Sequence, residues 1–293
     1  MMKRLNKFIS PAKLNLYLEV NNKRKDGFHN IESLMTFCEV GDVIRIERSK
    51  ALELKITGPF GKFLRHDENI ILKVVKGLEQ LYERKFKVRV TLEKNLPISS
   101  GMGGGSSNAA TVVRAIHNIF GINESKDLDN FLISIGADVP FCYYGKTAVI
   151  RGIGEKIEFV KHELCDYYVL LINPIKEVST KKIFEKLKIV KTKKAKKEIK
   201  SAKLNLEFLK EKENQLQAAE IQELYEIKTI LEFLKSETDS LYSRMTGSGA
   251  TCFSFYENKE SLKIAENMLK LKFPSFWVMK TKLVNSINDI NLV

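Results

Sequence analysis

Cysteine is scarce in this sequence, and its spacing is not that of a disulfide framework or a metal site. Its 293 residues include four cysteines, none in a CxxC pair, at positions Cys38, Cys142, Cys165 and Cys252. Disulfide frameworks and structural zinc sites depend on closely spaced cysteines. The spacing therefore excludes both and predicts reduced, buried thiols, in a chain long enough to bury one or two cores unaided.

Long apolar runs are missing too. The longest uncharged stretch, residues 95–113, is rich in Gly, Ser and Asn, whereas a membrane-spanning helix needs about 20 mainly apolar residues. Basic residues near the N-terminus imitate the start of a signal peptide, but Ser10, Pro11 and Lys13 interrupt any apolar stretch after them. The sequence therefore predicts a cytoplasmic protein with no membrane partner.

Positive charge is abundant but unevenly placed. The net charge is +13, and residues 181–203 hold eleven lysines against Glu185 and Glu198, which is +9 and leaves +4 for the rest. That segment has almost no aromatic residues, which surfaces for single-stranded nucleic acid interleave with basic ones. The lysines indicate a solvated segment and no nucleic-acid partner. An RNA-binding module stays open as an alternative, supported by the pI of about 9.4.

Periodicity predicts a mixture of strands and helices. Alternation over residues 13–20 predicts a strand with Leu14, Leu16 and Leu18 on one face and Lys13 on the other. Further strands are expected at 43–46, 52–56, 86–92, 167–172, 251–256 and 276–283. Helices are expected at 69–82, 109–120, 204–236 and 259–271, with an exposed His117 off the apolar stripe of the second. The class is α+β, without the regular βαβ alternation of a doubly wound sheet.

The strongest local feature is the loop Pro97–Ser107, between a predicted strand and a predicted helix. Four glycines between positions 101 and 105 remove Cβ atoms that would keep an anion from the backbone, and the helix start attracts negative charge. Ser106 and Ser107 add hydroxyl donors or a metal ligand. Because the loop lacks both the Walker A lysine and the third glycine of the dinucleotide fingerprint, it indicates another kind of phosphate cradle.

Three other segments carry candidate functional residues. Lys13 and Asn15 share the polar face of the first strong strand, from which both could reach a substrate. Asp138, among small and apolar residues, suits a proton acceptor but equally suits a turn or a helix cap. Thr246–Thr251 is a loop of small residues, which either lets the backbone approach a ligand or forms a tight turn.

Taken together and in this order, three segments resemble the motifs of the GHMP small-molecule kinases: residues 11–16 (PAKLNL), 101–107 (GMGGGSS) and 246–249 (TGSG). The resemblance covers about residues 8–256. It implies a two-domain α+β fold, with an N-terminal ATP-binding domain at 1–160 and a ferredoxin-like C-terminal domain at 161–293. It also implies a monomer or a weak homodimer.

The resemblance is sharper for those family members that phosphorylate an alcohol linked to cytidine diphosphate. The segments that carry it are residues 24–29 (RKDGFH), 136–141 (GADVPF) and 178–184 (VSTKKIF). Kinases for mevalonate-type, homoserine or sugar substrates are the alternative within the family. They would share the ATP loop but need no cytidine pocket, and residues 26–29 argue against them.

The resemblance also implies residue roles, with Lys13 and Asp138 as the catalytic pair. The expected ATP-binding residues are Asn69, Pro97, Ile98, Ser99, Ser100, Gly101, Met102, Gly103, Gly104, Gly105, Ser106 and Ser107. The expected substrate-binding residues are Asn15, Phe28, His29, Thr180, Phe184, Gly247, Ser248 and Gly249, with Phe28 and Phe184 as walls of a cytosine slot. Mg²⁺ would accompany ATP and supply charge to a loop without a P-loop lysine. No metal ligand is assigned, because Asn108 stands where the family usually has aspartate.

Overall fold

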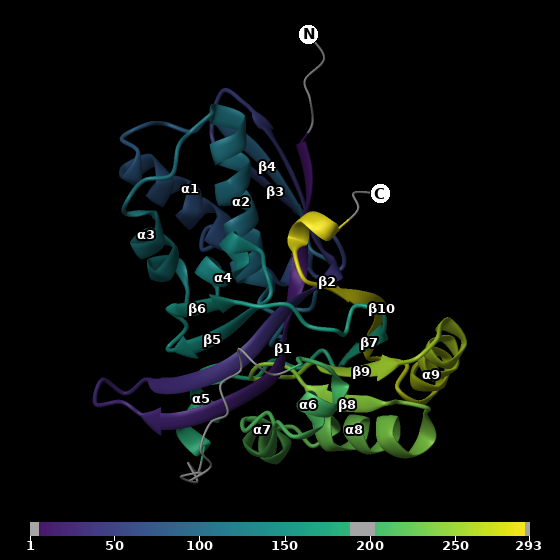
Figure 1. The fold of residues 1–293 in the computed structure, drawn as a ribbon. Coiled ribbons are helices and arrows are strands. Elements are labelled where there is room, and N and C mark those ends of the chain that lie inside the picture. Colours follow the sequence, from purple (N-terminus) through teal and green to yellow (C-terminus); the bar gives the residue numbers. More distant parts are fainter. Residues whose placement is uncertain (1–5, 188–202, 291–293) are drawn as a thin grey trace.

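The computed structural model of the protein describes residues 6–187 and 203–290. Within these ranges, strands and helices build two lobes on one mixed sheet of ten strands (Figure 1). The strands are β1 (Asn6–Lys23), β2 (His29–Arg48), β3 (Glu53–Thr57), β4 (Val88–Glu93), β5 (Ala148–Gly152), β6 (Lys156–Phe159), β7 (Tyr168–Asn173), β8 (Tyr242–Met245), β9 (Cys252–Tyr256) and β10 (Trp277–Val284). The helices are α1 (Ile70–Leu81), α2 (Gly104–Phe120), α3 (Leu128–Ile135), α4 (Val139–Tyr144), α5 (Thr180–Lys186), α6 (Leu206–Lys210), α7 (Gln217–Glu223), α8 (Glu226–Glu237) and α9 (Lys259–Lys272). Single 3₁₀ turns cover Gly61–Phe63 and Ile287–Asp289.

The N-terminal lobe is organised by the long hairpin of β1 and β2, which pair antiparallel over most of their length. Strands β4 and β5 add to β2, and helices α1 to α4 cover one face of this half of the sheet (Figure 1). The apolar stripes predicted from helical spacing supply that core: Ile71, Val74 and Leu78 of α1 and Val112 and Ile116 of α2 are fully buried. Burying these stripes against the sheet orients α2, whose first turn is the glycine loop.

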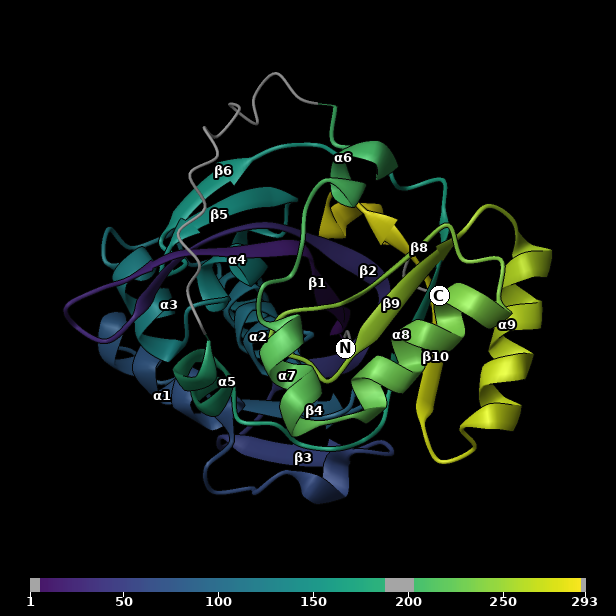
Figure 2. The ribbon, with the colours of Figure 1, turned by 90° about the horizontal axis from the view of Figure 1, so that it is seen from below.

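The C-terminal lobe is a four-stranded antiparallel sheet in the order β10, β7, β9, β8. Helix α8 lies between β7 and β8 in the chain, and α9 connects β9 to β10. Figure 2 shows α8 and α9 next to each other, beside β8, β9 and β10. This strand order and the two crossing helices confirm the expected ferredoxin-like α+β lobe.

The two lobes are joined by hydrogen bonds as well as by the chain. Strand β10 pairs with β2 at Leu283 and Val284. The last turn then returns to the N-terminal lobe, where Ile287 packs on its core. The division of domains at 160/161 stays a prediction. No helix in the described part of the chain is both long and apolar enough to cross a bilayer.

The predicted elements are confirmed, although several run further than their periodicity showed. The strand expected over 13–20 spans all of β1, and the one expected at 43–46 is only the last part of β2. The first part of β2 was missed because it is buried on both faces, which removes the alternation. Cys38, Cys142 and Cys252 are buried and unpaired as predicted, whereas Cys165 is half-buried. Nearly all of the lysine-rich stretch at 191–203 lies outside the described residues.

The expectation of an exposed His117 is wrong. His117 is buried in α2, where its Nε2 lies 3.1 Å from the Tyr82 hydroxyl and its Nδ1 lies 3.3 Å from the Tyr143 hydroxyl. Helical spacing placed it off the apolar stripe of α2. It could not show that α4 covers the same helix from the other side.

A buried histidine ties the connection between the lobes to both of them. His162 is 4% exposed, and its Nδ1 accepts a hydrogen bond from the Leu164 backbone N–H. Its Nε2 therefore carries the proton and donates to Thr36 Oγ1 of β2 at 2.8 Å. The Asn285 side chain, just after β10, bonds to both the N–H and the carbonyl of His162. These contacts, which we call the His162 hub, require the neutral imidazole, because one ring nitrogen accepts a hydrogen bond and the other donates one.

We expect this hub to make the stability of the protein fall in acid. Burial lowers the pKa of His162 to about 4, so its contribution is fully present above the unfolded value of about 6.5 and is lost as the pH falls toward 4. The free energy of unfolding should drop by about 2–3 kcal/mol more between pH 7 and 4.5 in the wild type than in His162→Gln. Urea denaturation at both pH values measures the difference. Exposed His66 provides the control, because His66→Gln should keep the wild-type slope.

Candidate active site

Strand β1 carries two candidate residues at a point where its pairing is irregular. The β1–β2 register shifts between Pro11 and Lys13, and again between Asn15 and Tyr17. Such irregularities re-aim side chains next to functional sites. Lys13 and Asn15 thus lie on a short regular stretch between two shifts, and both line one cleft of about 1730 Å³ between the lobes.

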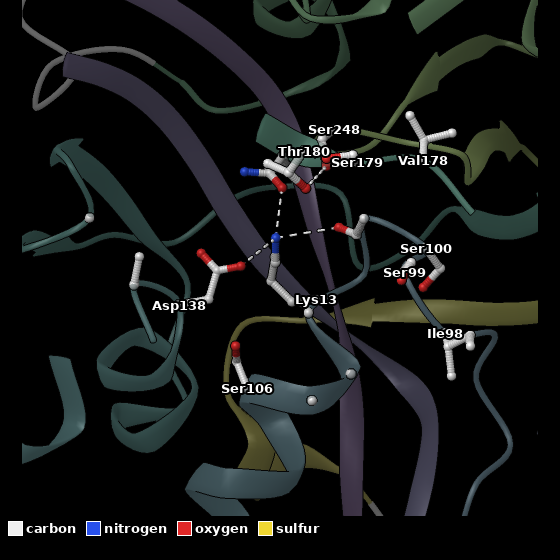
Figure 3. Close-up of a pocket in the computed structure, with 18 of the residues that line it drawn as sticks. Lys13, Ile98, Ser99, Ser100, Ser106, Asp138, Val178, Ser179, Thr180 and Ser248 are labelled. Carbon is white, nitrogen blue, oxygen red and sulfur yellow. Dashed lines mark hydrogen bonds and ion pairs between the residues drawn. The ribbon is translucent and has the colours of Figure 1, made fainter. Parts of the chain in front are cut away.

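Lys13 is the centre of the polar contacts in this cleft (Figure 3). Its Nζ lies 2.9 Å from Asp138 Oδ2, 2.9 Å from Asn15 Oδ1 and 3.4 Å from the carbonyl of Gly101. Lys13 itself is 4% exposed, so the ammonium is held in one place by three oxygen acceptors. A fixed, largely desolvated charge of this kind stabilises developing negative charge far better than a solvated one.

Asp138 immediately precedes α4 but does not cap it, because its side chain makes no capping hydrogen bond. The carboxylate is instead 31% exposed toward the cleft and pairs with Lys13. Of the alternatives that the sequence left open, the turn is present, because residues 137–138 form a turn that ends at the N-cap position of α4, but the side chain does not cap the helix. The role of proton acceptor stays a prediction.

The glycine loop forms the floor below this pair. Gly101 and Gly103 have φ values of 75° and 63°, which disfavour any residue with a Cβ. A Cβ on Gly103 would lie 2.9 Å from the Lys13 Cε, whereas one on Gly105 would meet nothing within 4 Å. The first turn of α2 therefore presents its free N–H groups to open space directly under Lys13, which is the geometry of an anion cradle.

Not every predicted loop residue faces the cleft. The lining includes Pro97, Ile98, Ser99, Ser100, Gly101, Gly103, Gly104, Gly105 and Ser106, with Asn69 from the start of α1. Met102 is fully buried in the core. Ser107 is also buried, and its hydroxyl bonds to Ser10 Oγ at 3.0 Å. Both lie behind the loop, where they fix its backbone.

The second small-residue loop packs against the first. A Cβ on Gly101 would lie 2.5 Å from the Thr246 carbonyl oxygen and 2.8 Å from that of Gly249. The Thr251 N–H donates to the Ser100 carbonyl, and Thr246 Oγ1 accepts from the Asn15 N–H. Gly101 is thus required by this close approach of two backbones. Gly247 and Ser248 line the cleft, and Gly249 lies behind them.

The far end of the cleft carries the aromatic candidates, in a different pairing from the expected one. The rings of His29 and Phe184 are stacked, with centroids 5.1 Å apart. Phe28 is 60% exposed in the turn between β1 and β2, so Phe184 faces His29 and not Phe28. Thr180, at the start of α5, lies within 2.8 Å of the Ser248 hydroxyl. Burial, followed by the charge of Lys23, lowers the pKa of His29 and favours the neutral ring.

One functional candidate was missed by sequence reasoning. Lys94, just after β4, lines the cleft and forms a buried ion pair with Asp42 at 2.5 Å. Its Nζ lies 3.0 Å from where a Cβ on Gly104 would be. Lys94 therefore places an ammonium beside the loop, although the loop itself contains no lysine. The only signal was its place three residues before Pro97, because the contact depends on the fold.

The residues of the cleft fit a magnesium ion that is bound together with the phosphates of a nucleotide. Within residues 6–187 and 203–290, no three His, Cys, Asp or Glu side chains gather closely enough to hold a metal. Magnesium needs few protein ligands when phosphates and water supply the rest. Asp138 and Ser106 present oxygens to the cleft, and the buried Asn108 Oδ1, on the same lining, lacks a hydrogen-bond partner among the described residues.

An ammonium and carboxylate pair above the N-terminus of a helix is an arrangement suited to phosphoryl transfer. The family description "GHMP kinases N terminal domain" matches residues 69–146, and "GHMP kinases C terminal" matches residues 195–275. The chain belongs to the GHMP kinase family and is a small-molecule kinase.

Within that family, the chain is similar to proteins named 4-diphosphocytidyl-2-C-methyl-D-erythritol kinase. The enzyme of that name from Chelativorans sp. (strain BNC1) is 35% identical over 292 residues, which are 97% of this chain and 98% of the relative. The one from Rhizobium etli (strain CIAT 652) is 35% identical over 280 residues, 94% of this chain and 93% of the relative.

Solved structures share the fold. A crystal structure of 4-(cytidine 5'-diphospho)-2C-methyl-D-erythritol kinase has a TM-score of 0.77 at 24% identity and covers 94% of this chain and 99% of that chain. A homoserine kinase from Cytophaga hutchinsonii has a TM-score of 0.67 at 18% identity, covering 98% of this chain and 97% of that chain. These likenesses confirm the two-domain kinase architecture.

Proposed function

We propose that this protein transfers the γ-phosphoryl group of ATP to the 2-hydroxyl of 4-diphosphocytidyl-2-C-methyl-D-erythritol, a step of the non-mevalonate isoprenoid pathway. The observation that carries the proposal is the Lys13–Asp138 pair, held 2.9 Å apart above the N-terminus of α2. The cleft that contains this pair extends to His29 and Phe184. The name shared by relatives that match nearly the whole chain supports the choice of acceptor.

Phosphoryl transfer does not require a covalent intermediate on the protein. Phosphoryl transfer passes through a loose transition state, so positioning and neutralisation of charge dominate. The phosphates of ATP would bind at the N–H groups of Gly103 to Ser106, with Mg²⁺ held beside Asp138 and Ser106 to neutralise them. Lys13 would stabilise the developing charge at the acceptor oxygen. Asp138 would accept the hydroxyl proton as the new bond forms.

Acceptor recognition is proposed to use the aromatic end of the cleft. The neutral His29 imidazole offers one N–H donor and one acceptor, which suits the edge of a cytosine. Phe184 offers a stacking face, and the stacked contact of the two rings would open to admit the base. Asn15 and the Gly247–Gly249 loop would lie beside the sugar alcohol. Phe28, on the exposed turn, would approach from solvent.

Replacing Phe184 with alanine should weaken binding of the cytidine substrate by about 1–3 kcal/mol, because one stacking face is removed. The KM for ATP should barely change. Phe184 also packs on the core of the C-terminal lobe, so thermal stability must be measured on the same preparation. Phe233→Ala is the matched control, since Phe233 packs on the same core outside the cleft. A destabilised Phe184→Ala enzyme with an unchanged KM for the cytidine substrate would exclude the stacking role.

The proposed function is tested by a coupled assay of ADP release. The protein should turn over with the cytidine-linked methylerythritol and not with mevalonate, homoserine or galactose. Preference for one of those alcohols would assign a different GHMP activity. Salt-sensitive RNA binding without ATP turnover would instead favour the RNA-binding alternative.

We also propose that the enzyme works in the cytoplasm as a monomer or weak homodimer. Size-exclusion chromatography tests the oligomeric state.

A further inference from the structure

Gly249 is held between two parts of the fold that face it from opposite sides. On one side lies Gly101 of the glycine loop, whose Cβ, if present, would be 2.8 Å from the Gly249 carbonyl oxygen. On the other side, a Cβ on Gly249 would lie 2.9 Å from Met245 Sδ and 3.0 Å from Glu220 Oε1. Glu220 therefore supports, from behind, the place where the two small-residue loops meet.

Glu220 is an unusual residue for that position. It lies on α7 and is 0% exposed. Neither Oε1 nor Oε2 has a hydrogen-bond partner in the described part of the chain. Met245, whose Sδ lies with Glu220 against Gly249, belongs to the apolar core of the C-terminal lobe. A carboxylate without a partner in such a place is strongly destabilised, whereas a protonated carboxyl costs much less.

We propose that Glu220 is a positioning residue that keeps the Thr246–Thr251 loop against the glycine loop only while its carboxyl group is uncharged. When the group ionises, it draws water toward the loop junction and loosens the contact between Gly249 and Gly101. The consequence reaches the catalytic centre, because Lys13 bonds to the Gly101 carbonyl. This inference rests on the proposed function, in which the two loops hold the substrates.

The groups around Glu220 do not neutralise its charge. The Cys252 thiol of β9 stays protonated, because burial and Glu220 itself raise its pKa. On β8, the Arg244 guanidinium donates to backbone carbonyls of Leu16, Leu209 and Lys212. Glu223, on the same helix, pairs with Lys186 at the surface. With burial as the cause, the pKa of Glu220 rises to about 7, so the group titrates near neutral pH.

The test compares pH profiles of wild type and Glu220→Gln, which keeps the shape of the side chain but cannot ionise. The kcat/KM for the cytidine substrate should be similar in both near pH 6. Near pH 8, the wild type should be lower by roughly tenfold, as expected for one proton lost with a pKa near 7. Glu223→Gln removes the same charge from the same helix and should follow the wild type. Parallel profiles of wild type and Glu220→Gln would overturn the inference.

Two further measurements separate this inference from the proposed function. Wild-type turnover of the cytidine substrate near pH 6 tests the function alone. Calorimetric titration with ATP tests the loops without turnover. The Kd for ATP should rise with pH in the wild type but not in Glu220→Gln. Glu220→Met serves as a second non-ionising variant if the glutamine variant is unstable. If the Kd for ATP rises with pH equally in the wild type, Glu220→Gln and Glu220→Met, Glu220 is not a positioning residue.

Discussion

Replacing Asp138 with asparagine is expected to lower kcat by roughly 10²- to 10⁴-fold while ATP still binds. The change keeps the shape of the side chain and removes its capacity to accept a proton. The glycine loop is not altered, because Asp138 makes no capping hydrogen bond that the loop or α4 depends on. Single-turnover kinetics and ATP titration on one preparation measure both quantities.

The asparagine result has a clear control and a clear contrary outcome. Asp127, exposed at the start of α3, loses the same charge in Asp127→Asn and should leave kcat unchanged. A loss of kcat confined to Asp138→Asn, with an unchanged Kd for ATP, supports the role of proton acceptor. Near-normal turnover in Asp138→Asn would remove this residue from the mechanism.

Lys13 should be nearly as sensitive, for an electrostatic reason. Lys13→Met removes the ammonium that three oxygens surround, including Asp138 and Asn15. Loss of a fixed charge at the reacting oxygen should lower kcat by about 10²–10³-fold. Lys13→Arg should not restore full activity, because a planar guanidinium does not replace a compact ammonium held by these acceptors.

The thermal stability of these variants must be measured, because Lys13 is buried and its removal leaves three oxygen acceptors without their donor. Circular dichroism melting separates loss of folding from loss of chemistry. Lys55→Met, on the exposed side of β3, is the control for removing a positive charge elsewhere. A fully active Lys13→Arg enzyme would show that the charge acts at a distance and not at the reacting oxygen.

Much of the site could be predicted because its parts are local in sequence. The glycine loop leads directly into the apolar stripe of α2, so the strand, loop and helix order follows from spacing alone. Alternation likewise identified the strand that holds Lys13 and Asn15. The order of the motifs identified the family, and the strand and helix pattern of the second half was consistent with the ferredoxin-like lobe.

Contacts between distant segments could not be predicted in this way. His117 looked exposed because helical spacing reports one face of a helix, and a second layer of packing covers the other. Phe28 and Phe184 looked like partners, but Phe28 is largely exposed where it lines the cleft, and His29 is the ring that stacks on Phe184. Spacing along the chain could not show which of these two neighbouring rings meets Phe184, because that contact joins segments far apart in sequence.

The sequence by itself determined the local elements, the glycine loop and the family, since each depends on residues within a few turns or one strand of each other. Tertiary structure alone decided which side chains meet. It paired Lys13 with Asp138, 125 positions later, brought Lys94 to the glycine loop and placed Glu220 behind Gly249. The physical reason is that burial and charge pairing depend on distances in space, and only the packing of helices and strands into a compact fold creates those distances.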